Sequence, residues 1–272
     1  AISAPSPARW HVCHPPARDT MAFGAAGWPS SALPGAAALE GELVWPMGSG
    51  EEPSLLEKPL ALLGRAAAGG GAPAPRTTLW DESRRCFVFH WPELLRGRAN
   101  QRYYMESLQE LAPWKDIIGP TGEVTRSTCW YARGRCRCDY TYGNQRIRKA
   151  RPSSHRFASV MEDLTKRVFG LACPGWPEEA WPNSANLNLY ASSSQAVGWH
   201  ADDESLFMGK DDDCRIVSLS LGERREFWLG RRSEYDRARP DHGSVLEVDL
   251  SSGDLLTMEG LCQKHCLHAV PP

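Results

Sequence analysis

A short segment of the C-terminal half carries the residue types of a metal site. His200 and Asp202 are separated by one residue in the run WHADDE (199–204). Because residues two apart in an extended strand point to the same face, one ion can reach both side chains. An imidazole and a carboxylate are two of the three ligands in the facial triad of non-haem iron(II) oxygenases. Taken alone, such a pair is more often a solvated turn, so the prediction needs a third ligand.

The third ligand must be a histidine that lies far along the chain and is brought near by the fold. His268, towards the end of a later extended run, is the leading candidate, because His265 lies three residues earlier and is expected to point elsewhere. Three ligands on one face leave the opposite coordination positions free for a cosubstrate and O2. The sequence therefore predicts a metal centre with open positions.

The elements that must position these residues are helices first and strands afterwards. Apolar periodicity predicts helices over 101–111, with Asn100 as N-cap, and over 154–168. Short apolar or alternating runs predict strands over 86–90, 186–190, 217–221, 226–229, 244–250, 255–259 and 265–270. Several short strands after two helices indicate a β-sandwich or barrel buttressed by helices.

The first 76 residues differ in composition from the rest of the 272-residue chain. Of these 76 residues, 44 are Ala, Gly, Pro or Ser, and the run AAAGGGAPAP (66–75) cannot pack a core. We expect residues 1–76 to be a low-complexity, disordered leader and residues 77–272 to be one folded domain. There is no pattern of a secretory signal and no apolar run of membrane-spanning length, whereas an organelle transit peptide stays open.

The nine cysteines are an odd number in a chain that is not small, which favours reduced thiols and a protein of the nucleus or cytoplasm, with an organelle left open. The segments CRC (136–138) and CQKHCLH (262–268) raise the alternative of zinc, but their spacing is poor for a zinc finger. Buried thiols are the default. The acidic run DDD (211–213) lacks the glycine and glutamate of a calcium loop.

The net charge of −2 conceals a basic segment. Residues 126–156 hold nine Lys and Arg but one acid, so their formal charge is +8 against −10 for the remainder. Four aromatic residues interleave with these cations, namely Trp130, Tyr131, Tyr140 and Tyr142. Because cations bind phosphates and rings stack on bases, the mixture suits a single-stranded or flipped-base substrate. A solvated basic loop whose aromatic residues belong to the core is the alternative.

In chain order, several of these segments resemble the AlkB family of Fe(II)- and 2-oxoglutarate-dependent nucleic-acid dealkylases. The matching runs are RSTCWY (126–131), YTYG (140–143), NLY (188–190), HADDE (200–204), GDLLTMEG (253–260) and LHAVP (267–271). The resemblance covers about residues 86 to 272. It implies a mainly β fold with flanking helices, built on a double-stranded β-helix (jelly-roll) core. It also implies oxidative removal of N-alkyl groups from DNA or RNA bases with Fe(II), 2-oxoglutarate and O2.

The resemblance implies a role for each matching residue. His200, Asp202 and His268 match the iron ligands, which are also the catalytic centre, and Asn188 and Tyr190 match contacts of 2-oxoglutarate. The candidate substrate contacts, including Tyr131 for its place among the cations, are Arg126, Trp130, Tyr131, Tyr140, Tyr142, Asp203 and Glu204. A carboxylate among them would favour an alkylated base that carries positive charge.

One feature of the family has no match in this chain. The family pattern continues past the last histidine into a strand with arginines, one of which pairs with the far carboxylate of 2-oxoglutarate. This sequence stops four residues after His268, and neither Arg224 nor Arg225 falls on that pattern, so we expect the last strand to be truncated. A catalytically impaired nucleic-acid-binding module and a protein-directed 2-oxoglutarate dioxygenase stay open. The expected partner is alkylated DNA or RNA, with no membrane, and the expected state is a monomer.

Overall fold

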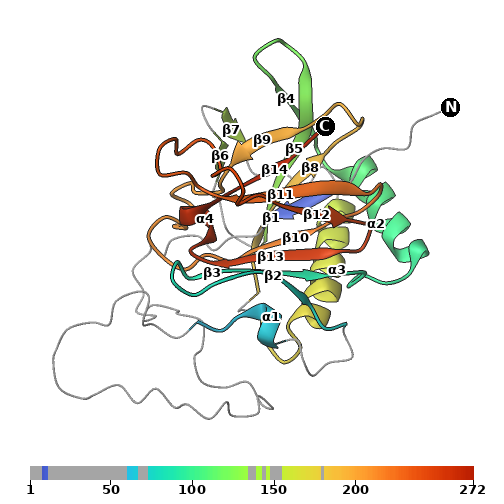
Figure 1. Cartoon of the computed structure of the whole chain (residues 1–272). Coiled ribbons are helices and arrows are strands. Elements are labelled where there is room, and N and C mark those ends of the chain that lie inside the picture. The colour runs from blue at the N-terminus through green and yellow to red at the C-terminus, as the bar shows by residue number, and fades with distance from the viewer. Residues whose placement is uncertain are drawn as a thin grey trace, which may run out of the picture.

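The chain folds into layers of antiparallel strands with two long helices along one side (Figure 1). The computed structural model describes residues 8–11, 60–66, 73–133, 139–142, 145–147, 155–178 and 181–272. The helices are α1 (Leu63–Ala66), α2 (Arg98–Leu111), α3 (His155–Ala172) and α4 (Cys262–His265). None of these described helices combines the length and the apolar character that crossing a bilayer requires.

The strands form three four-stranded sheets and one hairpin, and all their pairs are antiparallel. The first sheet has the order β1 (Ala8–His11), β8 (Ser184–Leu189), β5 (Val124–Ala132), β4 (Lys115–Ile118). The second has the order β10 (Ile216–Leu219), β13 (Leu255–Gly260), β3 (Cys86–Trp91), β2 (Arg76–Asp81). The third has the order β12 (Leu246–Leu250), β11 (Arg225–Arg231), β14 (Cys266–Val270), β9 (Val197–His200). The hairpin joins β6 (Tyr140–Tyr142) and β7 (Gln145–Ile147). This arrangement confirms the expected mainly β domain with flanking helices and a jelly-roll core.

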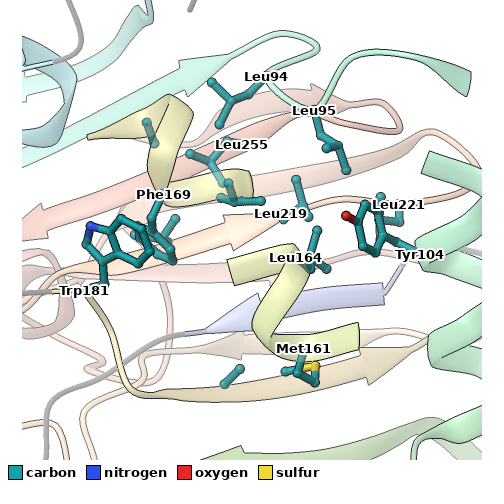
Figure 2. Close-up of a cluster of buried hydrophobic side chains, with 14 of the residues drawn as sticks. Leu94, Leu95, Tyr104, Met161, Leu164, Phe169, Trp181, Leu219, Leu221 and Leu255 are labelled. Carbon is teal, nitrogen blue, oxygen red and sulfur yellow. The ribbon is translucent and has the colours of Figure 1, made fainter. Parts of the chain in front are cut away.

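The larger apolar core lies between the two long helices and the sheets. Figure 2 labels some of the side chains that meet there, among them Tyr104 of α2, Leu164 of α3 and Leu255 of β13. The apolar residues of α3 recur at helical spacing, so one side of the helix is buried against the strands. A side chain that is fully removed from water in this way contributes about 1.5–3 kcal/mol. The helices therefore fix the strands that carry the site.

A second core lies between the sheets. Strand β3 is buried along its whole length and serves both cores, because alternate side chains point to opposite faces. Phe87, Phe89 and Trp91 join the core under the helices, whereas Cys86 and Val88 join the second core. The prediction of a buried strand at 86–90 is thus confirmed. Its sequence is a nearly continuous apolar run because both faces of the strand are buried.

Several predicted element ends differ from the structure by one to four residues, and the two long helices are examples. Helix α2 begins at Arg98 after Gly97, whose φ of 91° suits a residue without a Cβ, so the prediction of Asn100 as N-cap was wrong. The Asn100 side chain instead donates to the Arg96 carbonyl from within the first turn. Helix α3 continues to Ala172 rather than ending at residue 168, because Phe169 and Ala172 extend its buried side.

Part of the segment that was expected to be a leader packs on the domain. Leu62 and Leu63 belong to the core under the helices, and the Leu63 N–H donates to Glu259. Glu259 pairs with Arg215 at 2.9 Å, with both side chains at most 4% exposed. Arg215 also donates to the Ala61 carbonyl. A buried ion pair thereby holds residues 60–66 in place, whereas most of the stretch 1–76 lies outside the described residues.

Candidate iron centre

The three predicted iron ligands come together at the β9–β14 strand pair. His200 ends β9 and lies opposite His268 of β14 in the antiparallel register, and Asp202 follows β9 directly. One ligand atom from each residue lies within 4.8 Å of the others. The pairing of β9 with β14 thus brings His268 next to two residues that lie 66 or more positions earlier in the chain. This is what the prediction of a distant third ligand required.

The distances suit one ion shared by the three side chains. Nε2 of His200 lies 3.8 Å from Oδ1 of Asp202, and Nε2 of His268 lies 3.5 Å from Oδ2 of the same carboxylate. Nδ1 of His200 donates to the Gly198 carbonyl at 2.8 Å, which leaves Nε2 with its lone pair towards the carboxylate. Two imidazoles and one carboxylate are the donor set of the facial triad, so these residues fit Fe(II).

The side chains around the ligands hold them in this geometry. The buried Gln263 accepts the backbone N–H of Asp202 through Oε1 at 2.8 Å. The ring of Phe227 stacks on His268, with centroids 5.5 Å apart and an interplanar angle of 25°. Neither residue is identifiable from the sequence, because Gln263 acts on Asp202 across 61 positions and Phe227 belongs to an ordinary apolar strand pattern.

Of the two predicted 2-oxoglutarate contacts, Asn188 lies in β8 and Tyr190 directly follows that strand. Asn188 is buried, and its Oδ1 accepts from Nε of Arg126 at 3.0 Å. Leu187 points to the opposite face and enters the core under the helices, so the expected alternation holds there. Arg126, predicted as a substrate contact, is therefore a neighbour of a predicted cosubstrate contact.

Tyr190 is buried against Val197 and Val270, which flank the iron ligands in β9 and β14. The guanidinium of Arg225 lies over the Tyr190 ring at 5.1 Å and donates to the carbonyls of Gln195, at 2.8 Å, and Pro271. Burial lowers the pKa of this guanidinium. The structure thus gives Arg225 a place that the sequence pattern could not, next to a predicted cosubstrate contact.

Three aromatic rings stack next to the iron ligands. Trp130 and Tyr140 lie 5.1 Å apart at 21°, and Phe207 lies 5.7 Å from Tyr140 at 22°. Phe207 follows the HADDE run and was not predicted, because a single Phe in a loop carries no pattern. The Tyr140 hydroxyl donates to Oε1 of Glu204 at 2.9 Å, so the ring stack is tied to the segment that bears Asp202.

The carboxyl group of Glu204 lies in an unusual environment. Burial, together with the neighbouring charge of Asp202, raises its pKa to about 8. Its Oε2 atom is buried without a hydrogen-bond partner among the described residues. A buried carboxyl oxygen that has no hydrogen-bond partner among the described residues is suited to contact a polar or cationic ligand.

The remaining predicted substrate contacts lie elsewhere. Asp203 pairs with Nη2 of Arg232 at 3.3 Å and with Nζ of Lys210 at 3.4 Å. Tyr131 points to the opposite face of β5 from Trp130, where its hydroxyl donates to Glu162 and its ring packs on Phe157 in the core. Tyr142 ends β6, and its side chain lies outside the described residues. The structure thus brings Trp130, Tyr140 and Glu204 together but not Tyr131.

Comparisons with known proteins agree with this geometry. The family model of the 2OG-Fe(II) oxygenase superfamily matches residues 88–272. Over 179 residues the chain is 30% identical to human alpha-ketoglutarate-dependent dioxygenase alkB homolog 3, which covers 62% of this chain and 55% of that protein. Over 104 residues it is 30% identical to the Arabidopsis thaliana DNA oxidative demethylase ALKBH2, covering 33% of this chain and 32% of that one.

The solved structure of OsALKBH1 superposes with a TM-score of 0.42 at 18% identity, covering 67% of this chain and 84% of that chain. The chain spans about half the length of the alkB homolog 3 proteins that it matches. The family match covers more than half of the chain and includes all three candidate ligands. The chain therefore belongs to the 2OG-Fe(II) oxygenase superfamily, and within its matched part it is similar in sequence to AlkB homologues.

Proposed function

We propose that this protein removes N-alkyl groups from bases of DNA or RNA, as a monomer that acts on a single-stranded or flipped-out base. Bound Fe(II) with 2-oxoglutarate and O2 supplies the oxidation that hydroxylates an N-alkyl carbon and leaves succinate and CO2. The hydroxylated group then loses its C–N bond and departs as an aldehyde. The relative named DNA oxidative demethylase supports a nucleic-acid substrate.

The observation that carries the proposal is the ring stack beside the iron ligands. Trp130, Tyr140 and Phe207 are 1%, 2% and 6% exposed and cover one another's faces, so the stack forms a rigid apolar support for the residues that face the substrate. The Tyr140 hydroxyl fixes Glu204 next to these rings. Alkylation can make a base cationic. Such a base would place its positive charge next to this buried carboxyl group, so we expect cationic bases to be preferred as substrates.

A basic cavity close to Asp203 supports binding of the nucleic-acid backbone. It has a volume of about 430 Å³ and is lined by Arg84, Arg231, Arg232, Ser233, Glu234, Arg237, Lys264 and His265. Arg232 reaches from this cavity to Asp203, the neighbour of an iron ligand. Because phosphates bind to clustered Lys and Arg, affinity for nucleic acid should fall steeply with salt.

The direct test is turnover of defined oligonucleotides. The protein is incubated with Fe(II), 2-oxoglutarate and strands that carry 1-methyladenine or 3-methylcytosine, each as DNA and as RNA. Demethylated product and succinate are measured by mass spectrometry. We expect both products to appear together and to disappear in His200→Ala and Asp202→Ala. Binding of the methylated strand without succinate would favour a non-catalytic module, and turnover of peptides alone would favour a protein-directed enzyme.

Two tyrosines provide a matched pair for the substrate site. Tyr140→Phe removes the hydroxyl that donates to Glu204, and Tyr131→Phe removes one that donates to Glu162 away from the iron ligands. A hydrogen bond to a carboxylate is worth about 1.5–3 kcal/mol, so kcat/KM for the methylated strand should fall about 10-fold or more in Tyr140→Phe. Tyr131→Phe should retain kcat/KM within about twofold while losing about 1.5–3 kcal/mol of stability. Equal losses of kcat/KM in both variants would contradict the proposed site.

A further inference from the structure

A second set of metal-ligand atoms lies apart from the iron ligands. The thiols of Cys86, Cys262 and Cys266 all lie within 4.8 Å of one another, and the three residues are 1%, 1% and 6% exposed. They come from three elements, since Cys86 begins β3, Cys262 begins α4 and Cys266 begins β14. The other described free cysteines, Cys129, Cys173 and Cys214, do not join this group.

The fold brings the three thiols together through a tight turn after β13. Gly260 pairs with Cys86 in the strand register and has a φ of 72°, where its missing Cβ avoids the Arg85 carbonyl. The next residue, Leu261, donates its N–H to that same carbonyl at 2.8 Å. Helix α4 therefore starts directly over the beginning of β3. Cys262 and Cys266, four positions apart across this single turn, then face the same side.

The sulfur geometry suits one soft cation. With metal–sulfur bonds of about 2.3 Å, tetrahedral or trigonal thiolates lie about 3.8–4.0 Å apart, within the spread of these three atoms. Thiolates select soft ions such as Zn²⁺ and Cu⁺ over the harder ions that carboxylates and water prefer. No His, Asp, Glu or further Cys of the described part of the chain completes the group, which favours a low-coordinate ion.

Positive charge lies next to the thiols. Arg84 and Lys264 line the neighbouring basic cavity, and the thiol of Cys86 donates to the Arg84 carbonyl at 3.3 Å. Cationic side chains offset the negative charge that three thiolates retain around a univalent or divalent ion. We propose that Cys86, Cys262 and Cys266 bind one thiophilic d10 cation, Zn²⁺ or Cu⁺, as a structural site separate from the nitrogen- and oxygen-donor iron centre.

Such an ion would tie β3 and α4 to the start of β14. Cys266 lies two residues before His268 in that strand, so both side chains point to the same face. The cation would thus anchor the strand that carries His268, while Fe(II) itself is held by His200, Asp202 and His268. The expected signature is thermal stabilisation by a thiophilic ion that does not depend on Fe(II).

The test uses Cd²⁺ as a probe, because thiolate-to-Cd²⁺ charge transfer in the ultraviolet arises from sulfur ligands and not from the iron triad. The whole chain carries Cys13→Ser, Cys136→Ser and Cys138→Ser, which removes the cysteines outside the described residues. Metal-free protein is titrated with Cd²⁺, and the band should saturate at about one equivalent. Adding Cys86→Ser or Cys262→Ser should abolish the band, whereas the matched controls Cys129→Ser and Cys173→Ser should retain it.

Two further measurements complete the design. X-ray absorption of the Cd²⁺-loaded protein should count three sulfur neighbours, and this readout needs no cluster variant, so it holds even if a variant does not fold. Competition with Zn²⁺ and with Cu⁺ then distinguishes the two ions by the one that displaces Cd²⁺ at the lower concentration. A missing band in the protein that retains the cluster, a band that survives Cys262→Ser, or a single sulfur neighbour would overturn the proposal.

Discussion

Replacing Gln263 with leucine should weaken metal binding without touching a metal ligand. Gln263 is 1% exposed, and its Oε1 accepts the backbone N–H of Asp202 at 2.8 Å. Leucine fills a similar volume but leaves that N–H without an acceptor, which costs about 1–3 kcal/mol for a buried group. If this cost falls mainly on the metal-bound geometry, it corresponds to about a 5- to 150-fold change in affinity, in line with about 10- to 100-fold for other groups that orient metal ligands.

The assay is an anaerobic calorimetric titration with Mn²⁺ or Co²⁺ as redox-stable substitutes for Fe(II). Thermal unfolding of the metal-free protein is recorded in parallel. Gln101→Leu is the matched control, because Gln101 is also a buried glutamine and donates to the Leu95 carbonyl at 2.7 Å, in the core region under the helices. That variant should lose stability and keep its metal affinity within about twofold.

The reasoning fails if Gln263→Leu binds metal as tightly as the parent protein, or if both glutamine variants lose affinity equally. The first result would mean that the Asp202 backbone does not position its carboxylate. The second would mean that general destabilisation, rather than the hydrogen bond from Asp202, controls metal binding.

Two further changes separate stability from cosubstrate binding. Glu259→Gln leaves Arg215 buried beside a neutral group, so the free energy of unfolding in urea should fall by about 3–5 kcal/mol, whereas Asp241→Asn at the more exposed pair with Arg231 should change it by less than about 1 kcal/mol. Equal effects would refute the role of burial. Arg126→Leu removes the donor to Asn188 and should raise KM for 2-oxoglutarate by about 10-fold, as steady-state kinetics would measure, while metal affinity stays constant. An unchanged KM would mean that Asn188 does not contact 2-oxoglutarate.

Much of the site was predictable from the sequence because its key residues follow strand periodicity. The alternation around Asn188 needs only the period of two that every strand has, whereas Asp202 lies in the loop just after β9. The same rule could have excluded Tyr131, since adjacent residues of a strand point to opposite faces and Trp130 is its neighbour. Predicting both as substrate contacts neglected that constraint.

The residues that could not be predicted act through tertiary contacts alone. Gln263, Phe227 and Arg225 lie in an otherwise unremarkable one-turn helix and strand, and each acts on a partner tens of positions away. The buried pair Arg215–Glu259 also escapes local patterns, because charged residues in strands are usually assigned to the solvent face. Their roles follow from which strands become neighbours, and local propensity does not determine that.

Strand β9 is the edge strand of its sheet, and its two ladder pairs with β14 are interrupted by an irregularity. Its last residue, His200, faces His268 across that short pairing. An ion bound by both imidazoles therefore links this edge strand to β14 in addition to the backbone pairing. Amide exchange at residues 197–200 should slow when metal binds, and by reciprocity any substitution that frays this edge should speed metal release.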